Sequence, residues 1–206
     1  MDILGALQGL PYHSPKTYGS GRWIEDPEHF PRYAEVFAKI APHSMLEIGA
    51  FTGYSACTAA IACDTLARIE WIDNESGCRD SNKMVVENLR EIDPDILVAY
   101  WRTKEEATPT LPVDLIHIDA DHSYEAVKRD LEWASQLCPR WIIGHDYELP
   151  GGGVKEAVIE FLGRESITYP VTYGLYIIPA DWAEGYALFG GEPIDFQEDD
   201  ECDELS

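Results

Sequence analysis

The chain has 206 residues, a length that fits one domain whose core can be stable without disulfide bonds. Apolar residues make up 45% of it, and the formal net charge is −23. Nucleic acid and anionic membranes would therefore be repelled over much of the surface. We expect a globular protein that binds neither of them.

The sequence contains no apolar run long enough to span a bilayer, and its N-terminal stretch lacks the basic start of a secretion signal. The five cysteines include no Cys-x-x-Cys pair, and an odd number fits a disulfide framework poorly. We expect a cytoplasmic protein with reduced thiols. Its predicted parts are an N-terminal arm and helix (1–40), a main domain (41–190) and an acidic, disordered tail (191–206).

Short apolar runs alternate with amphipathic helical patterns along most of the chain. The predicted strands are 44–49, 67–73, 95–101, 113–119 and 140–146, and the predicted helices are 31–40, 54–63, 81–92, 123–137 and 153–162. Ser123 is placed to cap the fourth of these helices. Residues 167–180 predict two further strands around a turn at Thr172–Gly174.

This alternation is typical of an α/β protein. It predicts a Rossmann-like, doubly wound sheet of seven strands, mostly parallel, with helices on both faces and a C-terminal antiparallel hairpin. In such sheets ligands bind beyond the carboxyl ends of the strands, where the strand order switches. The polar clusters of this sequence fall at those strand ends.

The run LEIGAFTGYSA (46–56) predicts a strand, a turn and the start of a helix. Gly49 and Gly53 allow a tight turn and a close approach to a ligand. The spacing is not Gly-x-Gly-x-x-Gly, and Glu47 would repel a bound pyrophosphate, which disfavours a nicotinamide-dependent oxidoreductase. A ligand with an amino group and a sulfonium suits Glu47 better. A plain strand-to-helix turn explains the glycines alone equally well.

The same run resembles the S-adenosylmethionine (SAM) loop of class I methyltransferases, most closely that of catechol and caffeoyl-CoA type O-methyltransferases. The resemblance implies that Glu47 and the backbone around Gly49 hold the methionine part of SAM. It also implies that Ser55 lies beside the SAM carboxylate at a helix N-terminus. The loop residues assigned to SAM in this way are Glu47, Gly49, Ala50, Gly53, Tyr54 and Ser55.

Three further strand ends extend the expected SAM site. Asp73 ends the second strand, where an acid can accept both ribose hydroxyls. Trp101 closes the third strand, where class I methyltransferases contact the adenine, although core packing is the alternative reading. Asp119 ends the fourth strand and completes the set.

The stretch DLIHIDADHSYE (114–125) places Asp119, Asp121 and His122 directly after a strand. Its DADHSYE part resembles bacterial small-molecule and sugar methyltransferases. The stretch also resembles metal-dependent O-methyltransferases, in which this strand ends in an acid that binds a divalent cation. A basic residue three positions later takes the proton of the substrate hydroxyl. The resemblance implies that Asp119 is a metal ligand and His122 the catalytic base. Lysine is usual at the second position, but histidine titrates near neutral pH and can serve as a base.

The stretch IIGHDY (142–147) places His145 and Asp146 where the catechol-type enzymes carry an Asp-Asn pair of metal ligands. The implied metal ligands are Asp119, His145 and Asp146. A nitrogen ligand moves the expected cation from Mg²⁺ toward Mn²⁺, Fe²⁺ or another transition metal. As alternatives, His122 could simply begin a helix, and His145 could form hydrogen bonds without a metal. The remaining histidines are expected to be surface or core residues: His13, His29, His43 and His117.

These observations predict a SAM-dependent O-methyltransferase that acts on a small hydroxylated molecule with help from Mg²⁺, Mn²⁺ or another divalent cation. A metal-independent methyltransferase and a non-catalytic SAM-binding protein are the alternatives. By analogy with related enzymes, Tyr18, Arg22 and Trp23 could form a lid, or could belong to a packed N-terminal arm. A homo-oligomer is compatible with the sequence.

Overall fold

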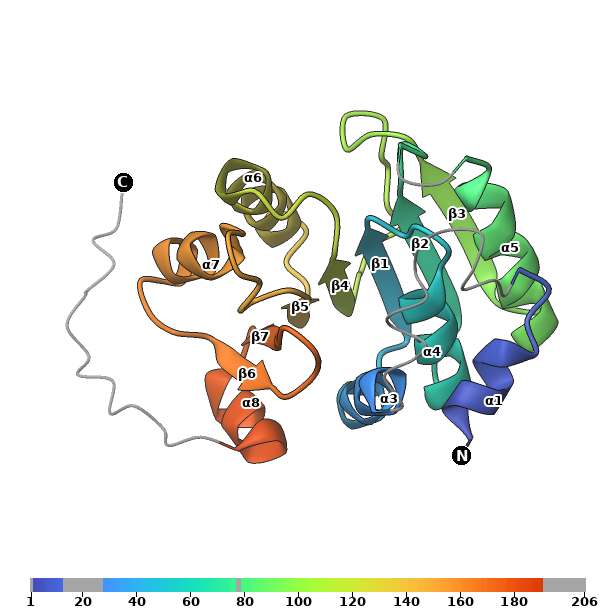
Figure 1. Cartoon of the computed structure of the whole chain (residues 1–206), viewed down its shortest axis with the longest axis horizontal. Helices are drawn as coiled ribbons and strands as arrows, with labels where there is room; N and C mark the ends of the chain where they lie inside the picture. Colours follow the sequence, from blue (N-terminus) through green and yellow to red (C-terminus); the bar gives the residue numbers. More distant parts are fainter. Residues whose placement is uncertain (1, 13–27, 77–78, 191–206) are drawn as a thin grey trace.

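The computed structural model describes residues 2–12, 28–76 and 79–190, and these form alternating strands and helices (Figure 1). The strands are β1 (Ser44–Ile48), β2 (Arg68–Ile72), β3 (Leu97–Trp101), β4 (Leu115–Ile118), β5 (Trp141–Gly144), β6 (Ile167–Tyr169) and β7 (Leu175–Pro179). The helices are α1 (Ile3–Gln8), α3 (His29–Ile40), α4 (Tyr54–Ala62), α5 (Ser81–Ile92), α6 (Tyr124–Ser135), α7 (Val154–Leu162) and α8 (Trp182–Phe189). The predicted lid residues Tyr18, Arg22 and Trp23 and the predicted tail lie outside the described residues.

The strands form one seven-stranded sheet in the order β3-β2-β1-β4-β5-β7-β6. The first five strands in this order are parallel, whereas β7 runs antiparallel to both β5 and β6. The predicted mostly parallel sheet with a C-terminal antiparallel hairpin is therefore confirmed. The strand order switches between β1 and β4, so the carboxyl ends of these two central strands mark the expected ligand crevice.

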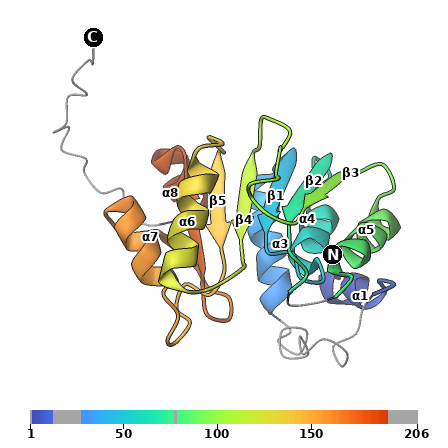
Figure 2. The same ribbon diagram turned by 90° about the horizontal axis from the view of Figure 1, so that it is seen from above.

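Helices cover both faces of the sheet, as predicted (Figure 2). Alternate residues of a strand point to opposite faces, and in β4 Leu115 joins one core cluster while Ile116 joins the other. Helices α1, α3, α4 and α5 contribute buried residues to the first cluster, and α6 and α7 to the second. The central strands β1, β4 and β5 are buried along their whole length, which holds their carboxyl ends rigidly beside one another.

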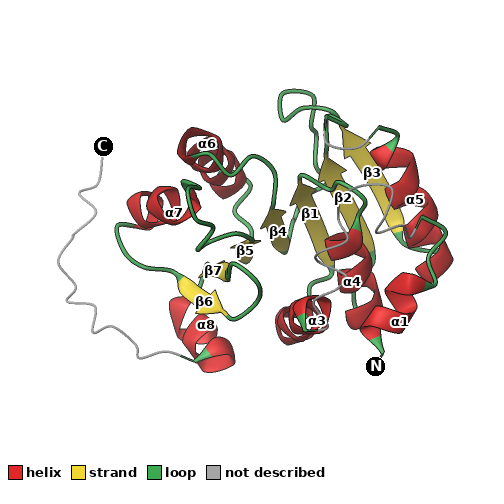
Figure 3. Cartoon of the chain, viewed as in Figure 1, coloured by secondary structure: helices red, strands yellow, loops and turns green. Residues whose placement is uncertain are grey.

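The connection from β3 to β4 contains no helix. Residues 102–112 form a largely exposed loop that carries the chain from the edge strand to the middle of the sheet (Figure 3). The edge strand β3 is only partly buried as a result, and Leu97 is 67% exposed.

Local details differ from the sequence prediction at helix ends. Ser123 occupies the N-cap position of α6, but its side chain makes no capping hydrogen bond. Instead the Asp121 carboxylate accepts the Ser123 N–H at 2.9 Å, which orders the same turn. Helices α1 and α8 were not predicted. Within the ranges that the structure covers, no helix has the length and apolarity needed to cross a bilayer.

Candidate active site

The loop between β1 and α4 turns at two glycines with positive φ angles. Gly49 has a φ of 89°, and a Cβ built on it would lie 2.2 Å from the Asp119 carbonyl oxygen. Gly53 has a φ of 78°, and its Cβ would lie 2.8 Å from a methyl group of Val85. The predicted tight turn is confirmed. These close approaches are to neighbouring protein residues, so the loop lies tightly against the end of β4 at Gly49 and against α5 at Gly53.

A first cavity of about 320 Å³ opens beside this loop, bounded by α3 and by the carboxyl ends of β4 and β5. It brings together eight of the residues predicted for the site: Gly49, Ala50, Tyr54, Ser55, Asp119, His122, His145 and Asp146. Helix α3 adds His29, Phe30 and Tyr33, which were not predicted as site residues. The cavity thus has an aromatic wall on one side and carboxylate and imidazole groups on the other.

A second cavity, of about 490 Å³, shares Gly49 and Asp119 with the first and extends along the ends of β1 and β2. Asp73 lines it, and the two oxygens of its carboxylate accept the N–H groups of Phe51 at 2.8 Å and of Glu75 at 2.6 Å. The Ser81 hydroxyl also donates to Oδ1, at 3.4 Å, so Oδ2 keeps a free lone pair, whereas Oδ1 can bind a ligand hydroxyl by replacing Ser81. Trp101 does not line this cavity; its neighbour Arg102 does.

Glu47 lies beneath the loop, with no exposed surface, and it lines none of these cavities. Its Oε1 atom lies 2.8 Å from His117 Nδ1 and also accepts a hydrogen bond from the Ser55 hydroxyl. Burial raises the pKa of Glu47, although the hydrogen bond and charge of His117 oppose this. Contact between Glu47 and the methionine part of SAM stays a prediction, since protein groups surround the carboxylate here.

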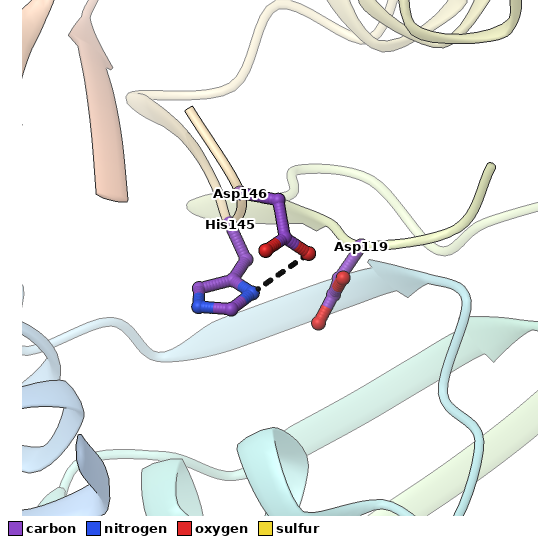
Figure 4. A group of neighbouring side chains, drawn as sticks. All are labelled: Asp119, His145 and Asp146. Carbon is purple, nitrogen blue, oxygen red and sulfur yellow. Dashed lines mark ion pairs between the residues drawn. The ribbon is translucent and has the colours of Figure 1, made fainter. Parts of the chain in front are cut away.

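Three predicted metal ligands meet at the ends of β4 and β5. One ligand atom from each of Asp119, His145 and Asp146 lies within 4.8 Å of the other two (Figure 4). Asp119 follows β4, and His145 and Asp146 follow the neighbouring strand β5. Asp146 adopts a φ of 59°, an uncommon conformation outside glycine that turns the chain directly after the strand.

The hydrogen bonds of His145 fit a metal ligand. Its Nε2 atom lies 2.8 Å from the Thr172 carbonyl oxygen, which can only accept, so Nε2 carries a proton. In neutral histidine the Nδ1 lone pair then faces Asp146 Oδ2 at 3.0 Å, where two acceptors repel unless a cation or a proton lies between them. A backbone carbonyl that fixes one ring nitrogen is the usual support of a metal-binding histidine.

The charges around His145 also favour a bound positive charge. Burial disfavours its protonated form, but the hydrogen bond to Asp146 and the charges of Asp119 and Asp146 outweigh this and raise the pKa of His145. The second oxygen of Asp146, Oδ1, is buried and has no hydrogen-bond partner in the part of the chain that the structure covers. The donor set therefore fits a divalent cation.

His122 lies between the two carboxylates. Its Nε2 atom is 3.2 Å from Asp119 Oδ1 and 3.1 Å from Asp146 Oδ2. The hydrogen bond to Asp119 raises the pKa of His122, against the effect of burial. For Asp119, burial favours the neutral form, but the bond to His122 and the charges of the nearby histidines lower the pKa overall. His122 also lines a third cavity, of about 410 Å³, beside the loop from Leu149 to Gly152.

Comparison with known proteins identifies the fold and the domain. The chain matches no curated protein sequence. Residues 46–147 match the family model of a methyltransferase domain. The chain contains a methyltransferase domain and has the fold of SAM-dependent methyltransferases. The matched segment runs from the SAM loop to the residue after Asp146, and so contains the whole carboxylate and histidine cluster.

Solved structures with this fold include several methyltransferases. The O-methyltransferase TomG from Streptomyces achromogenes, in complex with SAM, is 20% identical over 85% of this chain and 93% of its own, with a TM-score of 0.56. The methyltransferase PaMTH1 of Podospora anserina, bound to S-adenosylhomocysteine (SAH), has a TM-score of 0.62 at 14% identity over 87% of this chain and 88% of its own. CalS11, a TDP-rhamnose 3′-O-methyltransferase, has a TM-score of 0.60 at 14% identity over 86% and 91%.

Proposed function

We propose that this protein transfers the methyl group of SAM to a hydroxyl of a small molecule, with a divalent cation held by Asp119, His145 and Asp146. The observation that carries the proposal is the cluster itself, in which a buried Asp146 oxygen has no hydrogen-bond partner among the described residues and the His145 lone pair faces a carboxylate. The O-methyltransferases among the structural neighbours support a hydroxyl as the acceptor.

The two connected cavities suggest how SAM lies in the site. The ribose would occupy the second cavity, with its hydroxyls on Asp73. The adenine would lie near Arg102, which lines this cavity, and Trp101 would pack beneath it without lining the cavity. The methionine part would run past Gly49 and Ala50 to the first turn of α4, at Tyr54 and Ser55. Unpaired N–H groups at a helix N-terminus favour a carboxylate there. Gly53 would shape this turn without contacting SAM.

The chemistry asked of the protein is orientation and proton removal. SAM supplies a methyl group already activated on a sulfonium. A bound divalent cation supplies Lewis acidity, which lowers the pKa of an acceptor hydroxyl. His122, at the same cavity wall, accepts the hydroxyl proton through Nε2, and the carboxylates of Asp119 and Asp146 stabilise the resulting imidazolium.

A metal-independent methyltransferase is the second candidate. The observation in its favour is that the ring of His122 already spans the two carboxylates, at 3.2 and 3.1 Å. In that case neutral His122 or His145 alone would accept the proton of the acceptor hydroxyl, and the two carboxylates would stabilise the imidazolium that results, without a cation. Methyl transfer that continues unchanged after treatment with EDTA would establish this candidate in place of the first.

Calorimetric titration with SAH, with and without Mn²⁺ or Mg²⁺, tests the proposal, followed by methyl-transfer assays on hydroxylated acceptors. We expect SAH binding by the wild type and metal binding that Asp119→Asn abolishes, because the amide removes one negative ligand. Asp114→Asn is the matched control: it lies at the opposite end of β4 and accepts the N–H groups of His43 and Ser44. Absence of SAH binding under every condition would refute the proposed function.

A further inference from the structure

A chain of four polar side chains runs beneath the SAM loop and joins four separate elements. The hydroxyl of Tyr33, in α3, lies 3.4 Å from Nε2 of His117, in β4. The other ring nitrogen of His117, Nδ1, lies 2.8 Å from Oε1 of Glu47, in β1. The Ser55 hydroxyl of α4 donates to the same Glu47 oxygen. Tyr33 is 2% exposed, and His117 and Glu47 are not exposed at all.

The sheet register creates the centre of this chain. Glu47 and His117 are paired positions on the parallel strands β1 and β4, so their side chains lie next to each other on one face. A buried carboxylate is costly unless it is well hydrogen-bonded, and an apolar pair would avoid that cost. An ordinary buried network is the simplest reading. However, the two side chains at the ends of this network, Tyr33 and Ser55, both line the first cavity, which indicates a role in ligand binding.

We propose that His117 and Tyr33 are positioning residues for SAM: they fix Glu47, which anchors Ser55 and with it the first turn of α4. This inference rests on the proposed function. Because the Ser55 hydroxyl donates to Glu47, binding of the SAM carboxylate depends on the backbone N–H groups of that turn. Their direction depends on where Ser55 is held. Glu47 thus acts on SAM through Ser55.

The position of His117 separates this role from chemistry at the carboxylate cluster. Its hydrogen-bond partners are Glu47 and Tyr33, neither of which is a proposed metal ligand. Tyr33, by contrast, also packs against His145, with ring centroids 5.9 Å apart. Changing His117 should therefore weaken SAM and SAH binding while leaving the affinity for Mn²⁺ unchanged.

The test measures SAH affinity by calorimetry for the wild type and for His117→Phe, which keeps a ring but loses both nitrogens. We expect SAH to bind about tenfold more weakly, the effect of losing one hydrogen bond to a charged group. The KM for SAM should rise in proportion, with little change in kcat at saturation. His43→Phe is the matched control, because His43 precedes β1 at the far end of the sheet and is exposed. It should leave SAH binding unchanged.

A double-mutant cycle shows whether the residues act in series. If His117 acts through Ser55, the double variant His117→Phe/Ser55→Ala should lose less SAH-binding free energy than the sum of the losses of the two single variants. Fully additive losses would overturn the inference, as would equal SAH affinity of folded His117→Phe and wild type.

If His117→Phe does not fold, Tyr33→Phe is the variant to measure, since it removes only the hydroxyl. Unchanged SAH affinity of Tyr33→Phe would also overturn the inference. A wild type that binds no SAH would instead refute the proposed function.

Discussion

At the scale of single residues, His145 sets the chemical character of the carboxylate cluster. It is the one nitrogen donor among the three proposed ligands, and the Thr172 carbonyl holds its ring in place. Nitrogen donors favour Mn²⁺ and other transition metals, whereas Mg²⁺ prefers oxygen. The identity of this side chain should therefore decide which cation binds.

The corresponding prediction concerns His145→Asp. We expect this change to strengthen Mg²⁺ binding more than Mn²⁺ binding, shifting the ratio of their dissociation constants by about tenfold, because the donor set becomes all oxygen. Electron paramagnetic resonance of free Mn²⁺, with Mg²⁺ as competitor, measures both constants. His43→Asp, on an exposed residue at the far end of the sheet, is the control. An unchanged ratio would show that His145 is not a ligand.

The sequence could predict the cluster residues because each lies within four residues after an apolar strand, at positions to which the resemblance to O-methyltransferases gives a role. Asp119, His122, His145 and Asp146 all line the first cavity as that pattern indicates. It could not predict the aromatic wall: Phe30 and Tyr33 have the spacing of any buried helix stripe, and only packing of α3 brings them to the site. The burial of Glu47 was also hidden, because it depends on the β1–β4 register.

At the scale of elements, the SAM loop and the end of β4 are fitted together at Gly49. Its φ of 89° disfavours other residues, and a Cβ would meet the Asp119 carbonyl oxygen at 2.2 Å. We expect Gly49→Ala to lower the free energy of unfolding by about 3 kcal/mol, since backbone strain and a backbone collision add. It should also weaken metal binding, because Asp119 must move.

Gly151→Ala provides the matched comparison for this prediction. Gly151 has a similar φ of 79°, but nothing lies within 4 Å of its Cβ position. Only the conformational cost remains, about 1 kcal/mol. Urea denaturation of both variants measures the difference. Equal losses of stability would mean that the contact between Gly49 and Asp119 does not constrain the loop.

The order of elements was readable from the sequence, but two short helices were not. All seven strands were predicted, and the five parallel ones lie within about two residues of their observed bounds, because long apolar runs bounded by polar turns are a strong signal. Helix α1 has only six residues and contains Gly5, which weakens any helical pattern. Helix α8 did carry a signal: Asp181 caps it by accepting the N–H groups of Ala183 and Glu184.

At the scale of the whole molecule, the net charge of −23 should destabilise the compact state through self-repulsion. We expect the melting temperature to rise between about 0.05 M and about 1 M KCl, as the screening length falls from more than 10 Å to about 3 Å. A chain ending at residue 190 keeps a net charge of −15 and should show a smaller rise. A melting temperature that falls with added KCl would contradict this account.

The exposed loop 102–112 divides the site along the chain. Before it lie the SAM loop and Asp73; after it lie Asp119, His122 and the β5 pair His145 and Asp146. The two stretches join where β4 lies beside β1, and α3 of the first stretch also packs against His145 of the second. The proposed methyl-donor site and the proposed acceptor groups thus lie largely in consecutive segments of sequence. A single recombination event within this loop could therefore exchange the acceptor half of the enzyme while its donor half is inherited intact.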